Sequence, residues 1–524
     1  MSEPPRHDVP LLAARAVSAA LVLLALLRAL TLGGEYYDAY ETRLAARTLL
    51  GWDTGQPFPV YRSPLLVLAS VACEGLGRAA AWVGPALLAA AAYGGLVAAV
   101  EVLARRLGAR PWVAAAAGTL CALDLAAWDH AAHGLPDVPA AAACALALMV
   151  AVRPGPWAAR PVTLGLLVGL AALARHNAGL VGLALLAGVP RADDGWRPAL
   201  GRVALAGVVS AGLYLAVSTL VFAWGRGSLG EGLAGHSALA EFQRLQLAEN
   251  RVRYGAQQPP LAALLYAALS MPWFALLAPL GAAHAARRGA SPAARACLVW
   301  AATHLLVLSV FAGHVEGRYL LPALPALAAL SALALDRLVG ARSGALVVAG
   351  LVALPLVLRG PFALAHARDP VTRASVPARL AAEVEAARGP QGRVFWTTTH
   401  PYPVAPRVVF EQGTPLPRDP VHAIFHVGPV VLAYHLERPV VLLGPVPGRE
   451  GGLREADDLR DLVRRARLGD GTPFRPGDVL VAGTPFPSRT WEVKGRAWPP
   501  LLIAPVVAGE GGVLDVAPRP FRSD

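Results

Sequence analysis

The sequence predicts an α-helical polytopic membrane protein with about eleven transmembrane helices, followed by a smaller soluble α/β domain. Hydrophobic residues make up 55% of the 524 positions and charged residues only 16%, a balance that indicates lipid as the main solvent. Apolar runs of roughly membrane-spanning length recur throughout residues 1-360. Residues 361-524 are richer in Pro, Gly and charges and contain short runs typical of strands.

The first apolar run, 11-32, follows a short charged segment and predicts an uncleaved first helix, because further spans come after it. Polar or Pro-bounded connections separate the later runs, most of them short, with a longer one at 225-259. The later runs lie at 82-104, 111-128, 137-152, 161-174, 176-190, 202-224, 260-284, 296-312, 318-336 and 343-359.

Short connections on one side of this path carry two or three arginines each, at 105-110, 153-160, 191-202, 287-295 and 337-342. The positive-inside rule places them in the cytoplasm of a protein of the inner (plasma) membrane, with the C-terminal domain outside. The prediction needs a turn at Arg175, because one helix over 161-190 would reverse every later segment. This path leaves no crossing for the apolar segment 64-80, which we expect to lie in the outer interface.

The net charge of +12 comes from arginines scattered in ones and twos beside apolar runs. That pattern is typical of topology signals, so no nucleic-acid partner is expected. No HExxH, Walker or GxGxxG motif occurs, and no cofactor is predicted. The cysteines lie in or beside apolar runs without paired spacing and are expected to be small buried hydrophobes: Cys73, Cys121, Cys144 and Cys297.

In the C-terminal domain, 361-524, the runs 394-397, 430-432 and 478-481 are rich in strand-forming residues, whereas 453-467 has helical apolar spacing. No catalytic signature stands out. The domain is expected either to bind the acceptor or to cover the site. The Tyr434-His435 pair is the first candidate for such a role, and buried packing is the alternative.

The first predicted outer loop places Asp38 just beyond the first span. A carboxylate at the membrane surface is a candidate general base toward a hydroxyl, or alternatively the ion-pair partner of Arg43 or Arg62. The other acids of this loop are interpreted as surface charges or helix caps, with Glu41 and Asp53 as possible secondary acids.

The loop before the tenth span reads HVEGRYLLPALP, with His314, Glu316 and Arg318 at the bilayer edge. Ionisable groups at that depth are costly unless they pair or face a polar cavity. One interpretation is a Glu316–Arg318 ion pair that caps a helix. The other is that Arg318 binds a phosphate, with His314 and Tyr319 adding donors.

Arg175 ends another apolar run on the same predicted face, and His130, His133 and Asp137 occupy a neighbouring turn. Three ligand-type side chains are able to bind a metal, but their spacing matches no zinc pattern strongly. Helix capping by Asp137 is the favoured interpretation.

These residues carry a resemblance to a known family. Asp38-Ala-Tyr40, the Tyr61-to-Leu65 step and the H-x-E-x-R-Y-L-x-P element from His314 to Pro322 resemble the GT-C glycosyltransferases. The likeness is to their bacterial branch, which includes protein mannosyltransferase-like and lipid A aminoarabinose transferase-like enzymes. It extends over roughly residues 10-360 in arrangement.

The resemblance implies a membrane enzyme that transfers a sugar from a polyprenyl-phosphate carrier to a lipid, glycan or protein acceptor, with inversion. Many relatives have two adjacent acids in the first loop, whereas Ala39 follows Asp38 here, so a partner acid would be Glu41 or Glu35 and metal assistance is not supported. Asp38 would be the general base, and the substrate contacts would be Arg62, Arg175, His314, Glu316, Arg318 and Tyr319.

Two other classes of function are weighed against this one. A transporter or lipid flippase predicts charges near span centres and an internal inverted repeat, and the sequence shows neither. A non-catalytic membrane scaffold would leave Asp38, Glu316 and Arg318 without a common purpose.

Overall fold

The computed structural model describes residues 8–32, 37–52, 58–153, 160–188, 196–254, 271–287, 291–311, 317–339, 370–398, 427–443, 456–465, 473–483 and 501–521, with isolated helical positions at 264 and between 346 and 357. The chain divides into two compact units. The first comprises 1–34, 63–221 and 246–366, and the second comprises 35–62, 222–245 and 367–524. The second unit therefore contains two segments from the N-terminal half, and the division at residue 360 stays a prediction.

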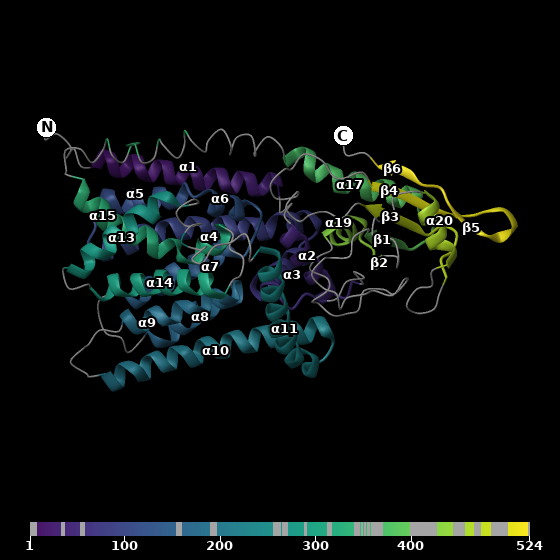
Figure 1. Ribbon diagram of the computed structural model, residues 1–524. Coiled ribbons are helices and arrows are strands. Elements are labelled where there is room, and N and C mark those ends of the chain that lie inside the picture. The colour runs from purple at the N-terminus through teal and green to yellow at the C-terminus, as the bar shows by residue number, and fades with distance from the viewer. Residues whose placement is uncertain are drawn as a thin grey trace. The chain divides into compact units, whose positions relative to one another are not determined.

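Helices dominate the first unit (Figure 1). Within the described residues, every expected span from 11-32 to 318-336 coincides at least in part with a helix, whereas 343-359 lies mostly outside them. The helices are α1 (Asp8–Leu32), α3 (Pro64–Gly75), α4 (Arg78–Arg106), α5 (Pro111–Ala122), α6 (Leu125–Ala132), α7 (Asp137–Ala151), α8 (Pro161–Ala174), α9 (Gly182–Gly188), α10 (Trp196–Arg226), α13 (Pro272–Arg287), α14 (Pro292–Phe311) and α15 (Leu324–Leu338), with 3-10 helices η2 (His176–Val181) and η3 (Gly317–Ala323).

The chain is a multi-pass membrane protein. Among the described residues, 5 helices are long and apolar enough to cross a bilayer, and the pair α5 and α6, bent by 62°, makes a sixth if it is one span. The 5 are Val9–Leu30, Ala80–Arg106, Arg197–Arg226, Pro292–Val310 and Gly317–Leu338. Shorter apolar helices include α3, which covers most of the segment predicted to lie in the interface.

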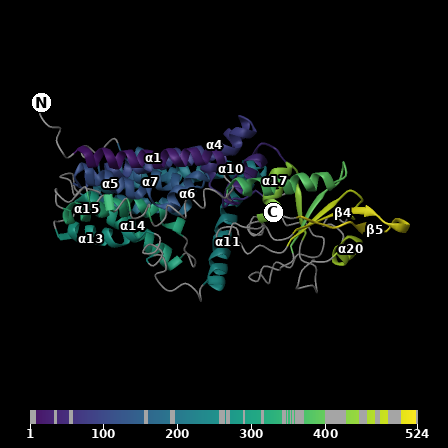
Figure 2. The same ribbon diagram turned by 90° about the horizontal axis from the view of Figure 1, so that it is seen from above.

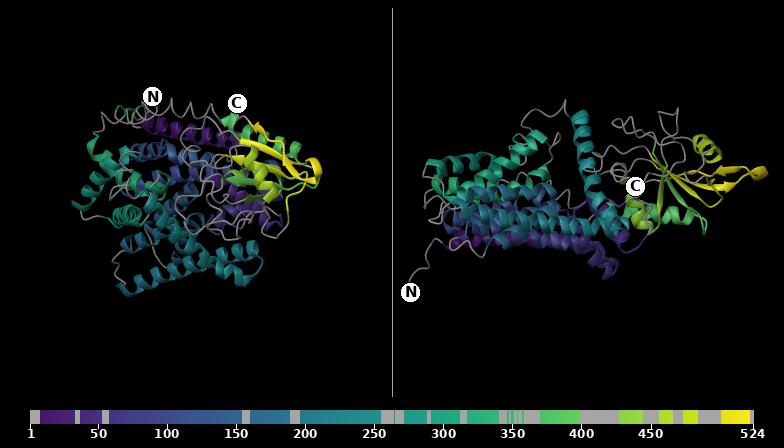
Figure 3. Two further views of the ribbon diagram at one scale, coloured as in Figure 1. Left: turned by 45° about the vertical axis from the view of Figure 1, so that its right-hand side comes forward. Right: turned by 90° about the horizontal axis from the view of Figure 1, so that it is seen from below.

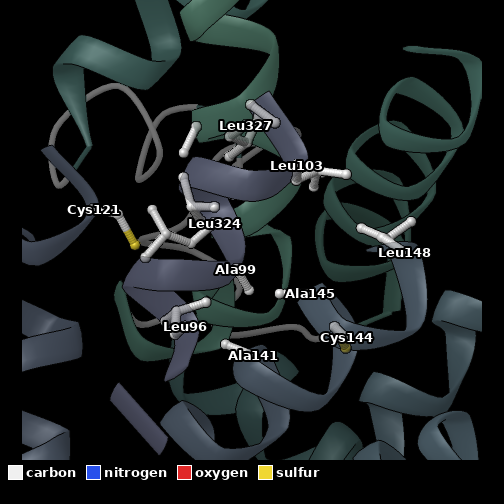
Figure 4. Packing of buried hydrophobic residues seen from close by; sticks show 14 of the residues in the cluster. Leu96, Ala99, Leu103, Cys121, Ala141, Cys144, Ala145, Leu148, Leu324 and Leu327 are labelled. Carbon is white, nitrogen blue, oxygen red and sulfur yellow. The ribbon is translucent and has the colours of Figure 1, made fainter. Parts of the chain in front are cut away.

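Small residues allow the helices of the first unit to pack closely. Figure 4 shows Ala99 of α4 beside Ala141 and Ala145 of α7, with leucines of α4, α7 and α15 around them. A Cβ added to Gly281 of α13 would lie 1.9 Å from the Leu330 carbonyl oxygen of α15, so the backbones of these two helices are in direct contact. Cys121, Cys144 and Cys297 are buried as predicted, and Cys73 is half-buried.

The predicted turn at Arg175 is present. α8 ends at Ala174, and Arg175 has extended backbone angles of φ −153° and ψ 120° before η2 begins. After this break Gly179 faces Ala172 and Gly182 faces Val168, so the chain runs back along α8 in the opposite direction. The described part of this segment, 161–188, is therefore two short helical pieces and not one long helix.

The second unit contains helices from distant parts of the chain. They are α2 (Tyr37–Leu49), α11 (Leu229–Tyr254, which continues into the first unit), α17 (Pro370–Ala387), α19 (Val427–Leu436), α20 (Ala456–Arg465) and the 3-10 helix η4 (Glu510–Gly512). The strands are β1 (Val394–Thr398), β2 (Val440–Leu443), β3 (Val479–Gly483), β4 (Leu501–Ala508), β5 (Leu514–Val516) and β6 (Arg519–Phe521).

These strands form one mixed sheet in the order β2-β1-β3-β4-β5, with β6 also pairing with β4. β1 is parallel to both β2 and β3, whereas β4 is antiparallel to β3. Phe395 and Leu480 pack toward Leu459 and Leu462 of α20. α17 lies against the opposite face, as Figures 2 and 3 show. The predicted α/β character is confirmed.

One predicted strand is wrong. Val430-Val431-Leu432 lies in helix α19, not in the sheet. Pro429 sits in the first turn, where a missing N–H costs little, and Glu437 takes a positive φ of 55° just after the last turn, before Pro439. The strand follows at 440–443, and α19 connects β1 to β2.

Candidate active site

The predicted base Asp38 lies in the first turn of α2, where a carboxylate is favourable beside the unpaired N–H groups of the helix. Its side chain is 18% exposed. The Arg62 guanidinium pairs with it, with Nη2 2.9 Å from Asp38 Oδ1. The sequence suggested Arg43 or Arg62 as an ion-pair partner of Asp38, and the structure shows that Arg62 is one.

The same guanidinium also binds Glu41, one helical turn further along α2. Arg62 Nε donates to Glu41 Oε2 at 2.5 Å, and the Tyr61 hydroxyl donates to Glu41 Oε1. Glu41 is only 3% exposed, so the interpretation of it as a surface charge or helix cap is wrong. Its burial depends on Arg62 and Tyr61, about twenty positions away, which no local pattern indicates. We call Asp38, Glu41, Tyr61 and Arg62 the acid centre.

Burial raises the pKa of Glu41 above its ordinary value. Arg62 and Tyr61 oppose the rise in part, and the negative charge of Asp38 adds to it. Burial is the largest of these effects, so Glu41 holds a proton at a higher pH than an exposed glutamate does.

An aromatic stack supports the acid centre. The Tyr61 ring stacks on Phe242 of α11, with ring centroids 4.4 Å apart and planes 16° from parallel. The Arg62 guanidinium carbon lies 5.1 Å from the centroid of the Tyr61 ring. α11 therefore contributes to the position of Tyr61, and through Tyr61 to that of Glu41.

Another buried part of α2 packs against α19. Tyr40 Oη and His435 Nε2 lie 3.2 Å apart, and Arg47 Nη1 donates to the Tyr434 carbonyl at 3.0 Å. Arg43 and Arg47 are 1% and 2% exposed, and both guanidinium groups lie near the Tyr434 ring. Tyr434 and His435 thus belong to a helix whose packing partner is the helix that carries Asp38 and Glu41.

In the first unit, Asp137 of α7 contacts polar side chains from two other segments. Its carboxylate, 1% exposed, pairs with the Arg175 guanidinium, and its Oδ2 lies 3.2 Å from His130 Nδ1. The residue at the N-cap of α7 is Pro136, and no side chain caps that end. The capping interpretation of Asp137 is therefore wrong, because Arg175 and His130 engage its carboxylate.

Arg175 and Arg318 both approach the Tyr319 ring. Their guanidinium carbons lie 4.8 Å and 5.4 Å from its centroid. Two guanidinium groups beside one ring bring two positive charges close together, an arrangement suited to an anion. We call Arg175 and Arg318 the arginine pair.

Two side chains of α14 hold the 3-10 helix η3 that carries Arg318 and Tyr319. Trp300 Nε1 donates to the Pro322 carbonyl at 2.9 Å, and His304 Nε2 lies 2.8 Å from the Tyr319 carbonyl. Trp300 and His304 are one helical turn apart and therefore lie on one face of α14. Both are fully or almost fully buried.

The sequence-predicted grouping of loops is confirmed within the first unit. Arg28 near the end of α1 pairs with Asp129 of α6 at 3.1 Å, and the His130, Asp137, Arg175 and Tyr319 contacts join the α6–α7 turn, the α8–η2 break and η3. Four segments that are distant in sequence thus meet at one end of the helices. Glu35, Asp53, His314 and Glu316 lie outside the described residues, so their predicted roles stay predictions.

Solved structures share this architecture. ArnT from Cupriavidus metallidurans bound to undecaprenyl phosphate aligns with a TM-score of 0.60 and 16% identity over 95% of this chain and 97% of that one. Its apo form aligns with a TM-score of 0.57 and 17% identity over 97% and 98%. The chain has a GT-C fold.

The archaeal oligosaccharyltransferase AglB from Archaeoglobus fulgidus, solved with an inhibitory peptide and a dolichol-phosphate, aligns at a TM-score of 0.50 and 14% identity over 95% of this chain and 74% of that one. No protein-family model matches the sequence, and no curated protein matches it. At these identities the similarity establishes the fold, as the first-loop and H-x-E-x-R-Y-L-x-P motifs led us to expect.

Proposed function

We propose that this GT-C protein is an inverting membrane glycosyltransferase that transfers a sugar from a polyprenyl-phosphate donor to an acceptor hydroxyl on the extracytoplasmic face. The observation that carries the proposal is the partly exposed Asp38 carboxylate, fixed by Arg62 at the first turn of α2. Two proteins of the same fold, ArnT and AglB, have been solved with undecaprenyl phosphate and with a dolichol-phosphate, which supports a lipid-linked donor.

In the proposed reaction, Asp38 accepts the proton of the acceptor hydroxyl while the hydroxyl oxygen attacks the anomeric carbon. The bond between the anomeric carbon and the phosphate oxygen breaks, and its electron pair leaves with the polyprenyl phosphate. A single displacement of this kind inverts the configuration at the anomeric carbon. Because negative charge develops on the leaving phosphate, guanidinium groups that bind it lower the barrier.

The arginine pair is the proposed phosphate-binding element. Arg175 is 19% exposed and oriented by Asp137, so its guanidinium is pre-positioned rather than free to rotate. Arg318 lies on η3, which Trp300 and His304 hold in place. An arginine fork is well suited to phosphate oxygens because it offers parallel N–H donors.

The described charges favour this proposal over a transporter. Arg28, Asp137 and Arg175 lie near helix ends or in the break between helices, and Asp129 lies in the short helix α6. None is in the middle of the long apolar helices. A transport path would need ionisable groups near span centres.

The proposal is tested with purified full-length protein in detergent, a membrane extract as acceptor source, and a panel of radiolabelled polyprenyl-phosphate sugars. We expect label transfer by the wild type and a loss of about 10² or more in rate for Asp38→Asn. Arg244→Ala is a matched control, because Arg244 forms an exposed ion pair with Glu241 on α11. Transfer that persists undiminished in Asp38→Asn contradicts the base assignment, and no transfer from any donor contradicts the function.

A further inference from the structure

The positive charge in the acid centre is the Arg62 guanidinium, which contacts both carboxylates. Arg62 Nη2 lies 2.9 Å from Asp38 Oδ1, Arg62 Nε lies 2.5 Å from Glu41 Oε2, and Nη2 also contacts Glu41. The guanidinium thus bridges two carboxylates that stand one turn apart on α2. The Arg62 side chain is 14% exposed and Glu41 is almost fully buried, so the bridge is an integral part of the fold and not a surface ion pair.

Two carboxylates one turn apart on a helix could supply oxygen ligands to a divalent cation. The residues present here do not fit such an ion. A divalent cation of the calcium or magnesium type requires about six or more oxygen ligands, which must point at one place. Here the Arg62 N–H groups occupy an oxygen of each carboxylate, and the other oxygen of Glu41 accepts from Tyr61.

The neighbours of the acid centre that the structure describes do not complete a metal site either. Among the residues that the structure describes, no group of three or more His, Cys, Asp or Glu side chains is arranged to hold a metal ion. The aromatic stack of Tyr61 on Phe242 lies on the Glu41 side and fixes the phenol that donates to Glu41. A cation inserted between the carboxylates would have to displace Arg62 and would be repelled by its charge.

We infer that Arg62 takes the place of a divalent cation in the acid centre, so that the transfer reaction proceeds without a metal. The inference rests on the proposed function. The guanidinium is always charged and its planar fork holds both carboxylates at once, which a lysine ammonium does only as a point charge. Arg62 is therefore a positioning residue for Asp38 rather than a ligand of the carrier phosphate, a role that the arginine pair retains.

This assignment predicts different kinetic effects for the loss of Arg62 and the loss of Arg175. Loss of Arg62 leaves two adjacent carboxylates without their bridge, so Asp38 is misplaced and kcat falls while the donor KM stays nearly constant. Loss of Arg175 removes a phosphate contact and raises the donor KM. A merely structural role for Arg62 would instead lower the fraction of folded protein and leave kcat per folded molecule unchanged.

The first experiment measures metal dependence in the full-length protein, stripped with EDTA and confirmed metal-free by elemental analysis. We expect the wild-type rate to stay within about twofold with and without Mg²⁺, Mn²⁺ or Ca²⁺. Activity that disappears after stripping and returns with one of these ions overturns the inference. A protein that transfers no sugar under any condition contradicts the proposed function instead, so the two failures are distinguishable.

The second experiment does not depend on activity. Mn²⁺ binding is followed by electron paramagnetic resonance in the wild type, Asp38→Asn and the control Arg244→Ala. We expect no Mn²⁺ to bind at the acid centre, and hence equal free Mn²⁺ signals in all three proteins. One Mn²⁺ bound by the wild type and by Arg244→Ala, but not by Asp38→Asn, overturns the inference.

The third experiment compares Arg62→Ala with Arg62→Lys. We expect a fall in kcat of about 10² for Arg62→Ala, with partial recovery in Arg62→Lys and the donor KM within about threefold of wild type. Thermal melting of each variant shows whether it is folded. A folded Arg62→Ala variant with unchanged kcat and a raised donor KM returns Arg62 to phosphate binding and overturns the inference.

Discussion

The guanidinium of Arg47 on α2 donates a 3.0 Å hydrogen bond to the carbonyl of Tyr434 on α19 and lies 4.2 Å from the centroid of the Tyr434 ring, although 387 positions separate the two residues. The Tyr434 carbonyl belongs to the last turn of α19, where carbonyls lack a partner within the helix and a positive charge is favourable. The C-terminal part of the chain thus fixes the helix that carries Asp38 and Glu41.

Replacing Arg47 by Ala removes this bond and leaves a void in a buried contact. We expect a destabilisation of about 2–4 kcal/mol, because a charged hydrogen bond and a cation–π contact are lost together. Thermal melting in detergent measures it, with Arg244→Ala as the exposed control. If Arg47→Ala melts like the control, α19 does not anchor α2.

Asp38→Asn and Glu41→Gln separate the roles of the two acids. Asp38→Asn should lower kcat by about 10² to 10⁴, because an amide cannot accept the acceptor proton. Glu41→Gln should have a smaller effect, since its amide oxygen still accepts a hydrogen bond from Arg62. Steady-state transfer kinetics of both variants test this order. A larger loss for Glu41→Gln would make Glu41 the base.

The raised pKa of Glu41 predicts how stability depends on pH. The unfolded chain holds this carboxyl at its ordinary pKa, so the folded state binds the proton more tightly. The resulting stabilisation is fully present below about pH 4.5 and is lost as the pH rises through the raised pKa. Glu41→Gln is uncharged throughout, so its melting temperature should rise relative to wild type between acid and neutral pH. A difference that stays constant with pH contradicts the shift.

Arg175→Ala should raise the KM for the polyprenyl-phosphate donor by about 10-fold to 100-fold, the value of one charged hydrogen bond to phosphate. Asp137→Asn should destabilise the protein by about 3–5 kcal/mol, because it breaks an ion pair whose carboxylate is buried. Donor titrations and thermal melting distinguish the two effects. An unchanged donor KM in Arg175→Ala would remove Arg175 from the phosphate site.

Gly281→Ala should be among the most damaging single-methyl additions in the first unit. The added Cβ would lie 1.9 Å from the Leu330 carbonyl oxygen, so α13 and α15 must separate. Gly212→Ala is the matched control on α10, because a Cβ there meets nothing within 4 Å. We expect a clear drop in melting temperature for Gly281→Ala alone, and equal melting of both variants contradicts the close backbone contact.

The sequence predicted those features that depend on local composition. Asp38 was identified because it lies just beyond an apolar run and Arg175 because it ends one, and the turn at Arg175 followed from the distribution of arginines. The burial of Glu41 was missed because it depends on Tyr61 and Arg62, which approach only in the folded chain. The roles of Arg43 and Arg47 were missed for the same reason, since their surroundings come from α19.

The one wrong strand has a related cause. Val430-Val431-Leu432 is β-rich when considered alone, yet the segment forms helix α19, which packs against α2 and α17. Local propensity is weak beside tertiary packing of this kind. The strands β4, β5 and β6 were not predicted, because they follow Pro-rich sequence and pair only with one another and with β3.

Because α2 packs against α19, the packing of α2 is completed only late in the synthesis of the chain. α2 leaves the ribosome early, but the segment that buries Arg43 and Arg47 is translated only after nearly four hundred further residues have been added. Until then Arg43 and Arg47 lack the α19 contacts that they have in the folded protein. A ribosome that stops before α19 therefore releases a product with its membrane helices complete and its acid-bearing helix unsupported, which gives quality-control proteases a physical basis for recognising it.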